Sequence, residues 1–258
     1  MNDNRVPEPD QTGAELPLLE HLLELRTRLL RILLGIAVFF APLAYFGKEV
    51  YSLVAQPLMK LMPAGTSMIA TEVASPFFAP LKLAGILAIA ASMPVTLYQV
   101  WAFVAPGLYR NERRLIAPLL GSSTLLFYGG IAFAYFLVLP TVFGFLVHVA
   151  PSGVAMMTDI NKYLDFVLAL FLAFGFAFET PVAIVLLVRT GFVTPQLLRE
   201  KRQYVLVGCF VVAAVLTPPD VLSQLLLAVP TYLLYELGIL ASIWTTPKPT
   251  PEEAMRDS

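Results

Sequence analysis

The longest uncharged stretch of the sequence runs from Leu115 to Thr158 and contains no Asp, Glu, Lys or Arg. A helix that crosses a bilayer needs only about 20 mostly apolar residues, with a rise of about 1.5 Å each. Other apolar runs lie on both sides of this stretch, and the charged residues cluster between them. Only 14% of the 258 residues are charged, whereas a soluble domain carries about 25%. The sequence therefore predicts an all-α integral membrane protein that crosses the bilayer several times.

Six segments are predicted to cross the membrane. They are residues 29–46, residues 83–109 with a start near Pro76, a third segment from 115 to about 140, and residues 161–188, 203–216 and 221–244. Pro140, Pro151 and Gly153 predict that the third helix ends near residue 140 and that an ordered loop follows. The fifth segment has 14 residues, which gives about 21 Å of helix against roughly 30 Å of hydrocarbon. We expect it to thin the bilayer locally or to lean on its neighbours.

Lysine and arginine are unevenly divided between the two sides that six crossings define. Thirteen of the 17 lie on the side of the two termini. The other four are Lys48, Lys60, Lys82 and Lys162. Because an excess of Lys and Arg marks the cytoplasmic side, we expect both termini to be cytoplasmic. Residues 1–17 are then a disordered tail, 18–244 the six-helix transmembrane domain and 245–258 a second tail, while 47–75 forms an amphipathic cap on the outer side.

Several functional classes receive no support from the sequence. The single cysteine, Cys209, lies in an apolar run, and His21 and His148 are far apart, so neither a disulfide framework nor a metal site is expected. No cofactor is predicted, and the net charge of −1 does not suggest a nucleic-acid partner. The sequence contains no HExxH or GxSxG motif and no convincing pair of nucleophile and base. The chain is therefore not expected to be an enzyme.

Glu179 is predicted near the middle of the fourth segment, in LAFGFAFETPVAIVLL. A carboxylate at the centre of a spanning helix costs roughly 2.5–3.5 kcal/mol, so it should face protein or water. One interpretation is a buried glutamate that is protonated or hydrogen-bonded to a neighbouring helix. The other is a polar site for a partner helix or a substrate segment. Pro181 frees a backbone carbonyl close by and can kink the helix.

The turn LTPPDVLSQ, residues 216–224, joins the fifth and sixth segments. Asp220 is placed to cap the sixth helix, because its carboxylate can accept hydrogen bonds from the first unpaired amides. Thr217 and Gln224 add polar groups beside a short helix. Such groups suit the docking of another transmembrane helix through hydrogen bonds.

Two further glutamates lie in segments expected at the cytoplasmic surface. Glu24, in the amphipathic stretch HLLELRTRLLR, is four residues before Arg28, which predicts an intrahelical salt bridge. Glu24 and Arg26 point in different directions, which leaves Glu24 partly available to another cation. Glu112 lies in GLYRNERR among three arginines. It either stabilises the start of the third helix through the helix dipole or awaits an external guanidinium.

These motifs together resemble those of a known family. They are HLLELR (21–26), SMIATEVASPFFAPLK (67–82), YQVWAFVAPGLYRNERR (98–114), STLLFYGGIAFAYF (123–136), FGFAFETPVAIVLL (174–187) and LTPPDVLSQ (216–224). In this order and topology they resemble TatC, the receptor component of the bacterial twin-arginine protein translocase, in its proteobacterial form. The resemblance covers about residues 16–244.

The resemblance implies a glove-shaped, concave bundle with short fifth and sixth helices in the cytoplasmic membrane. Such a receptor binds the twin-arginine signal peptides of folded proteins. It acts with the single-span proteins TatA and TatB, and transport is driven by the protonmotive force. The resemblance also implies contact with membrane lipids and a homo-oligomer within the receptor complex. By resemblance, Glu24, Glu112, Arg26 and Phe103 belong to signal-peptide binding, and Glu179, Thr217 and Gln224 are intramembrane polar positions for partner helices. Pro57 and Asp220 match functionally sensitive turn positions.

The residues alone leave other classes open. A proton- or ion-coupled transporter of small molecules could use Glu179 and Glu236. However, the sequence contains no internal repeat of the kind that builds the inverted halves of many transporters. An intramembrane enzyme is a weaker alternative, because no catalytic motif supports it.

Overall fold

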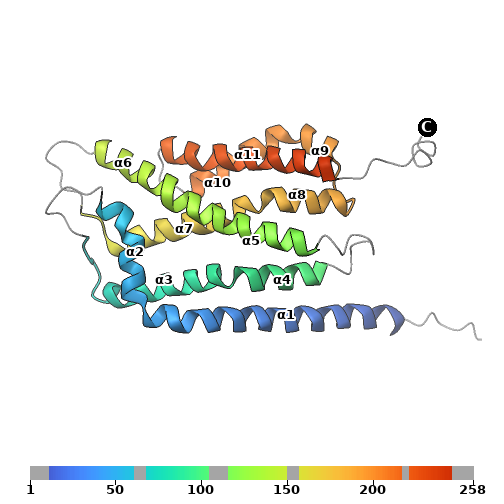
Figure 1. Cartoon of the computed structure of the whole chain (residues 1–258), viewed down its shortest axis with the longest axis horizontal. Coiled ribbons are helices and arrows are strands. Elements are labelled where there is room, and N and C mark those ends of the chain that lie inside the picture. The colour runs from blue at the N-terminus through green and yellow to red at the C-terminus, as the bar shows by residue number, and fades with distance from the viewer. Residues whose placement is uncertain (1–11, 61–67, 105–115, 150–156, 217–220, 246–258) are drawn as a thin grey trace, which may run out of the picture.

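The computed structural model describes residues 12–60, 68–104, 116–149, 157–216 and 221–245. Nearly all of these residues are helical, and the helices run along the long axis of the molecule (Figure 1). Within the described ranges, β pairing is limited to one isolated parallel bridge between Ile69 and Asp159. The predicted all-α class is therefore confirmed.

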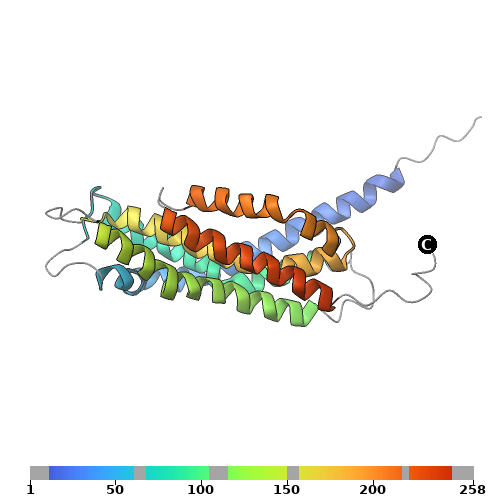
Figure 2. The same ribbon diagram turned by 90° about the horizontal axis from the view of Figure 1, so that it is seen from above.

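The first long helix, α1 (Thr12–Tyr45), is continuous through the amphipathic stretch and the first predicted span. It also includes residues 12–17 of the segment expected to be a tail, while residues 1–11 lie outside the described part. No residue between Leu22 and Tyr45 is fully buried. The helix forms one edge of the bundle, against α3 and α4, and its N-terminal half slants away from the other helices in Figure 2. Few packing contacts therefore hold this half of α1.

The second span consists of two helices, α3 (Ser75–Ala91) and α4 (Met93–Val104), which meet at an angle of 47°. Pro94, the second residue of α4, explains the break, because it lacks an amide donor and its ring crowds the carbonyl one turn earlier. The hydroxyl of Tyr128 donates to the carbonyls of Ala90 and Ala91, at 3.1 and 3.3 Å. A side chain from another helix thus binds carbonyls next to the bend.

The third span does not end near Pro140 as predicted. It runs through α5 (Ile116–Phe133), a π-helical segment (Ala134–Val138) and α6 (Leu139–Val149), and Figure 1 shows these in one continuous line. A proline within an α-helix clashes with the carbonyl four residues earlier. For Pro140 that carbonyl belongs to Phe136, inside the wider π turn, which makes room for the ring. The expected loop positions, Pro151 and Gly153, lie outside the described residues.

The fourth span is also composed of two helices, α7 (Ile160–Phe178) and α8 (Thr180–Arg189). Glu179 is the single residue between them, so the regular helix is interrupted two residues before Pro181. Since 19 residues precede Glu179 and 10 follow it, the glutamate lies about five residues past the midpoint of the span. This is little more than one helical turn past the midpoint, in keeping with the predicted position near the middle of the span.

The last part of the chain contains α9 (Pro195–Glu200), α10 (Arg202–Leu216) and α11 (Val221–Thr245). The prediction of a short fifth span is confirmed, because α10 has 15 residues. A short sixth helix is not observed, since α11 has 25 residues and continues through Pro230. A proline is tolerated within a spanning helix because neighbouring groups can satisfy the freed carbonyl. By length and apolar composition, four described helices can each cross a membrane, α3 with α4 makes a fifth crossing, and α10 is apolar but shorter.

The helices α5 and α7 pack closely against each other in the buried core. Phe127 and Phe174 are fully buried there. An ideal Cβ built on Gly130 would lie only 2.4 Å from the backbone oxygen of Phe174, and one built on Gly175 would lie 2.6 Å from the Phe127 ring. Small residues of this kind let spanning helices approach closely.

A helical cap covers the end of the bundle opposite the N-terminal half of α1 (Figure 1). It is α2 (Gly47–Met59), which forms the first part of the segment predicted as a cap. The buried hydroxyl of Tyr163 donates to the Val54 carbonyl at 2.8 Å, and Tyr135 donates to Leu53 at 3.0 Å. Asp159 caps α7 and also accepts hydrogen bonds from the amide and hydroxyl of Thr71. Tertiary hydrogen bonds therefore fix the cap to the spans.

Candidate functional site

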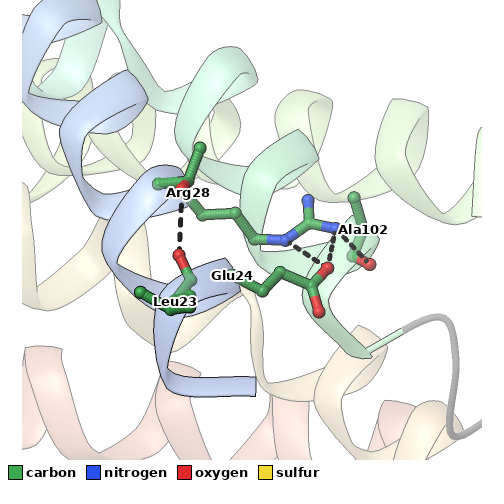
Figure 3. Close-up of polar contacts among 5 residues, drawn as sticks. Leu23, Glu24, Arg28 and Ala102 are labelled. Carbon is green, nitrogen blue, oxygen red and sulfur yellow. Dashed lines mark hydrogen bonds and ion pairs between the residues drawn. The ribbon is translucent and has the colours of Figure 1, made fainter. Parts of the chain in front are cut away.

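Glu24 and Arg28 form the predicted salt bridge near the N-terminal end of α1, and a third group joins them (Figure 3). The Arg28 guanidinium donates from Nε and Nη2 to Oε1 of Glu24, at 3.0 and 2.5 Å. Nη2 also donates to the backbone carbonyl of Ala102 at 3.0 Å. The side chain of Arg28 is only 16% exposed, and that of Glu24 is 37% exposed. The guanidinium therefore links a half-exposed carboxylate on α1 to the last turn of α4.

Helix polarity favours this link. The last carbonyls of a helix carry partial negative charge and lack partners within the helix, so a cation beside them is stabilised. The spacing of Glu24 and Arg28 predicted their pairing. Nothing in the sequence indicated the contact with Ala102, because it joins residues that are 74 positions apart.

Two of the other three residues predicted to bind a signal peptide, Arg26 and Phe103, lie at or near the same end of the bundle. Arg26 is exposed on α1. Phe103 is partly buried and directly follows Ala102 in α4. Glu112 lies outside the described residues, in the segment 105–115 that follows α4. The structure thus brings Glu24 close to the end of α4, and the role of all four residues in peptide binding stays a prediction.

A buried polar position lies deeper in the bundle, where Glu179 separates α7 from α8. Oε1 of Glu179 is inaccessible and has no hydrogen-bond partner in the described structure. Ser123 of α5 lies close to this carboxyl, and within the described residues its hydroxyl oxygen is also buried without a hydrogen-bond partner. Unsatisfied buried polar atoms are costly, so they favour a further polar partner. This geometry fits the interpretation of Glu179 as a polar docking position.

Gln224 lies at the junction of α10 and α11. Its side-chain amide donates to the backbone carbonyl of Phe210 at 3.1 Å, which ties the two helices together. A groove of about 350 Å³ opens beside it, and it is lined by Leu206, Val207, Phe210, Val211, Ala214 and Gln224. Thr217 and Asp220 lie outside the described residues, so the predicted cap of α11 is not seen. Pro57 lies within the helix α2, and its side chain is outside the described part.

Glu236, the second acid considered for a transporter, has partners in the structure. Arg202 of α10 donates to its Oε2 at 2.5 Å, and the hydroxyl of Tyr232 donates to Oε1 at 2.9 Å. These contacts join the start of α10 to α11. A carboxylate held in this way serves helix packing, so the structure gives no support to a proton path through Glu236.

The comparisons with known proteins agree with the motifs. The family model described as Sec-independent protein translocase protein (TatC) matches residues 20–230. The chain belongs to the TatC family. The TatC proteins of Escherichia coli K12 and Haemophilus influenzae Rd are 58% and 54% identical to it over 226 and 232 residues. These alignments cover 88% and 90% of the chain and 88% and 91% of the two relatives.

Solved structures support the same assignment. A crystal structure described as the twin arginine translocase receptor TatC superposes with a TM-score of 0.79 at 37% identity. It covers 88% of this chain and 100% of the solved chain. Membership of the TatC family makes the chain a multi-pass membrane component of a protein translocase, a class without enzymatic activity.

Proposed function

We propose that this chain is the receptor of a twin-arginine translocase in the cytoplasmic (inner) membrane. It binds the twin-arginine signal peptides of folded proteins and exports them together with TatA- and TatB-type partners, driven by the protonmotive force. The observation that carries the proposal is the Glu24 carboxylate, which Arg28 holds beside the end of α4 in a chain of the TatC family. The excess of Lys and Arg on the side of the two termini supports a cytoplasmic location for this end of the bundle, where a signal peptide arrives.

The chemistry of the carboxylate suits an arginine pair. A carboxylate can bind one guanidinium through two parallel, charge-assisted hydrogen bonds, and a lysine ammonium cannot reproduce this geometry. Neighbouring arginines point apart in an extended peptide, because successive side chains alternate in direction. Two separate carboxylates are therefore needed, and Glu24 and Glu112 are the two that we propose.

Ion pairs alone do not hold a folded cargo protein at the membrane, since exposed pairs contribute only about 0.2–1 kcal/mol each. Additional affinity comes from the apolar segment of the signal peptide, which packs against the helices. The arginine pair then supplies selectivity, and the apolar segment supplies much of the binding free energy.

Partner helices dock on the other polar positions in this proposal. Glu179 presents an unpaired buried oxygen, and Gln224 borders the apolar groove on the short helix α10. A polar side chain on a single-span partner can satisfy such a group within the membrane. Thr217 belongs to the same turn and is assigned to the same role.

The experiment that tests the function is export in a strain that lacks its own receptor gene. The chain is expressed in this strain with a folded reporter that carries a twin-arginine signal peptide. The proposal predicts export that stops when the membrane potential is dissipated or when the arginine pair is replaced by lysines. A chain that inserts normally but leaves the reporter in the cytoplasm, with its cognate TatA and TatB present, would contradict the proposal.

A further inference from the structure

We propose that Arg28 is a positioning residue for arginine recognition, because it fixes the Glu24 carboxylate against the last turn of α4. The inference rests on the function proposed above and names the residue that sets the specificity of the site. Both hydrogen bonds from Arg28 to the carboxylate end on the same oxygen, Oε1. The same guanidinium donates to the Ala102 carbonyl. The orientation of the carboxylate is thus coupled to the position of α4.

The surroundings explain why one side chain has this influence. Leu22, Leu25 and Leu29 of α1 are 60, 46 and 54% exposed, so this part of the helix has little packing of its own. A hydrogen bond from Arg28 to the Ala102 carbonyl joins it to α4. The segment that carries Glu112 follows α4 directly. The contact with Arg28 therefore sets the position of Glu24 relative to the last turn of α4.

The bridge also affects which cations bind. The guanidinium of Arg28 partly neutralises the charge of Glu24. A cation that cannot form directed hydrogen bonds with the carboxylate therefore binds it only weakly. A carboxylate in a fixed orientation favours a planar guanidinium, which makes directed hydrogen bonds, over an ammonium. Without Arg28, Glu24 loses both the nearby positive charge and the link that ties it to α4. It then attracts arginine and lysine more equally.

The test uses the full-length chain in membrane vesicles and two synthetic signal peptides, one with Arg-Arg and one with Lys-Lys at the motif. The measured quantity is the ratio of their dissociation constants. Arg28→Gln is expected to reduce the preference for Arg-Arg by about tenfold, on the scale of one hydrogen bond to a charged group. Arg28→Lys should also reduce it, because one ammonium does not reproduce the planar fork. The control Arg31→Gln removes the same charge from an exposed position on the same helix and should leave the ratio unchanged.

A double-mutant cycle tests whether Arg28 acts through Glu24. In a Glu24→Gln background, Arg28→Gln should have no further effect on the ratio, since the carboxylate that it positions is gone. Equal effects of Arg28→Gln with and without Glu24 would overturn the proposal. An unchanged ratio in both Arg28 variants would overturn it as well.

A second readout requires no peptide and separates this inference from the proposed function. Spin labels at Leu25 and Val100, both exposed, report the distance between α1 and α4 in a Cys209→Ser background. Arg28→Gln should broaden this distance distribution and Arg31→Gln should not. If wild type shows no preference for Arg-Arg while Arg28→Gln broadens the distances, the proposed function fails and the bridge stands. If Arg28→Gln leaves the distance distribution unchanged, the proposed positioning role of Arg28 is wrong, whatever the ratio of the peptide dissociation constants.

Discussion

Gly130 of α5 lies directly against the backbone carbonyl of Phe174 in α7, so closely that a Cβ at Gly130 would be 2.4 Å from that oxygen. A backbone oxygen cannot move aside as the end of a flexible side chain can. Gly130→Ala is therefore expected to destabilise the protein by about 1–3 kcal/mol. The measurement is thermal or denaturant-induced unfolding of the purified chain in detergent. Gly121→Ala, on the same helix with nothing within 4 Å, should be neutral or stabilising by up to about 1 kcal/mol. Equal losses in both variants would contradict this explanation.

Tyr163→Phe tests how the cap is held to the spans. Tyr163 is only 2% exposed, and its hydroxyl donates a hydrogen bond to the Val54 carbonyl. Removing the hydroxyl therefore leaves a buried carbonyl without this donor. We expect a loss of about 1–3 kcal/mol in unfolding free energy. Tyr135→Phe removes a similar bond to Leu53 at an exposed position, where water can replace the donor, and should cost less. The reverse order would show that burial does not decide the strength of these bonds.

Asp159 gives the cap a dependence on pH. Hydrogen bonds from the Thr71 hydroxyl and amide, and from the amides of Lys162 and Asn161, lower the pKa of this carboxyl from 3.8 to about 2. Because the folded state has the lower pKa, the stabilisation is complete above about pH 4 and is lost as the pH falls towards 2. Asp159→Asn should therefore lower the Tm at neutral pH. The difference from wild type should shrink in melts recorded from pH 4 towards pH 2, and a constant difference would contradict the assigned cause.

The proposed docking surface predicts proximity to a partner helix. Cysteines introduced at Val211 or Leu225, which are exposed near the groove beside Gln224, should form disulfides with cysteines along a TatA- or TatB-type span. Glu179→Gln should weaken this crosslinking by about threefold or more, if the unpaired oxygen contributes about 0.6 kcal/mol, as intramembrane hydrogen bonds do. The matched control is a cysteine at Tyr45, which is exposed at the far end of α1. Absence of disulfides at any position along α10 and α11 would count against docking there.

Much of the fold was predictable because each span is set by local composition. The apolar runs gave the order of the helices, and the spacing of Glu24 and Arg28 gave their ion pair. Pro140 shows where local rules fail: a proline predicts a helix end, but a π-helical segment before it allows the helix to continue. The contact between Arg28 and Ala102 was not predictable, because it depends on how two distant helices pack. Likewise, the hydrogen bond from Tyr128 to the carbonyl of Ala90 beside the bend joins residues 38 positions apart, and the local sequence does not reveal it.

In the proposed function, Glu24 and Glu112 bind the arginine pair of a signal peptide. The most direct test is site-specific crosslinking in membranes, from a photoreactive residue next to position 112 to the motif of a bound signal peptide. Glu112→Lys and Glu24→Lys should each reduce the crosslink by about tenfold or more, because a charge reversal replaces attraction with repulsion. Membrane insertion should remain normal in both variants. Full crosslinking and full export in both charge reversals would contradict the account.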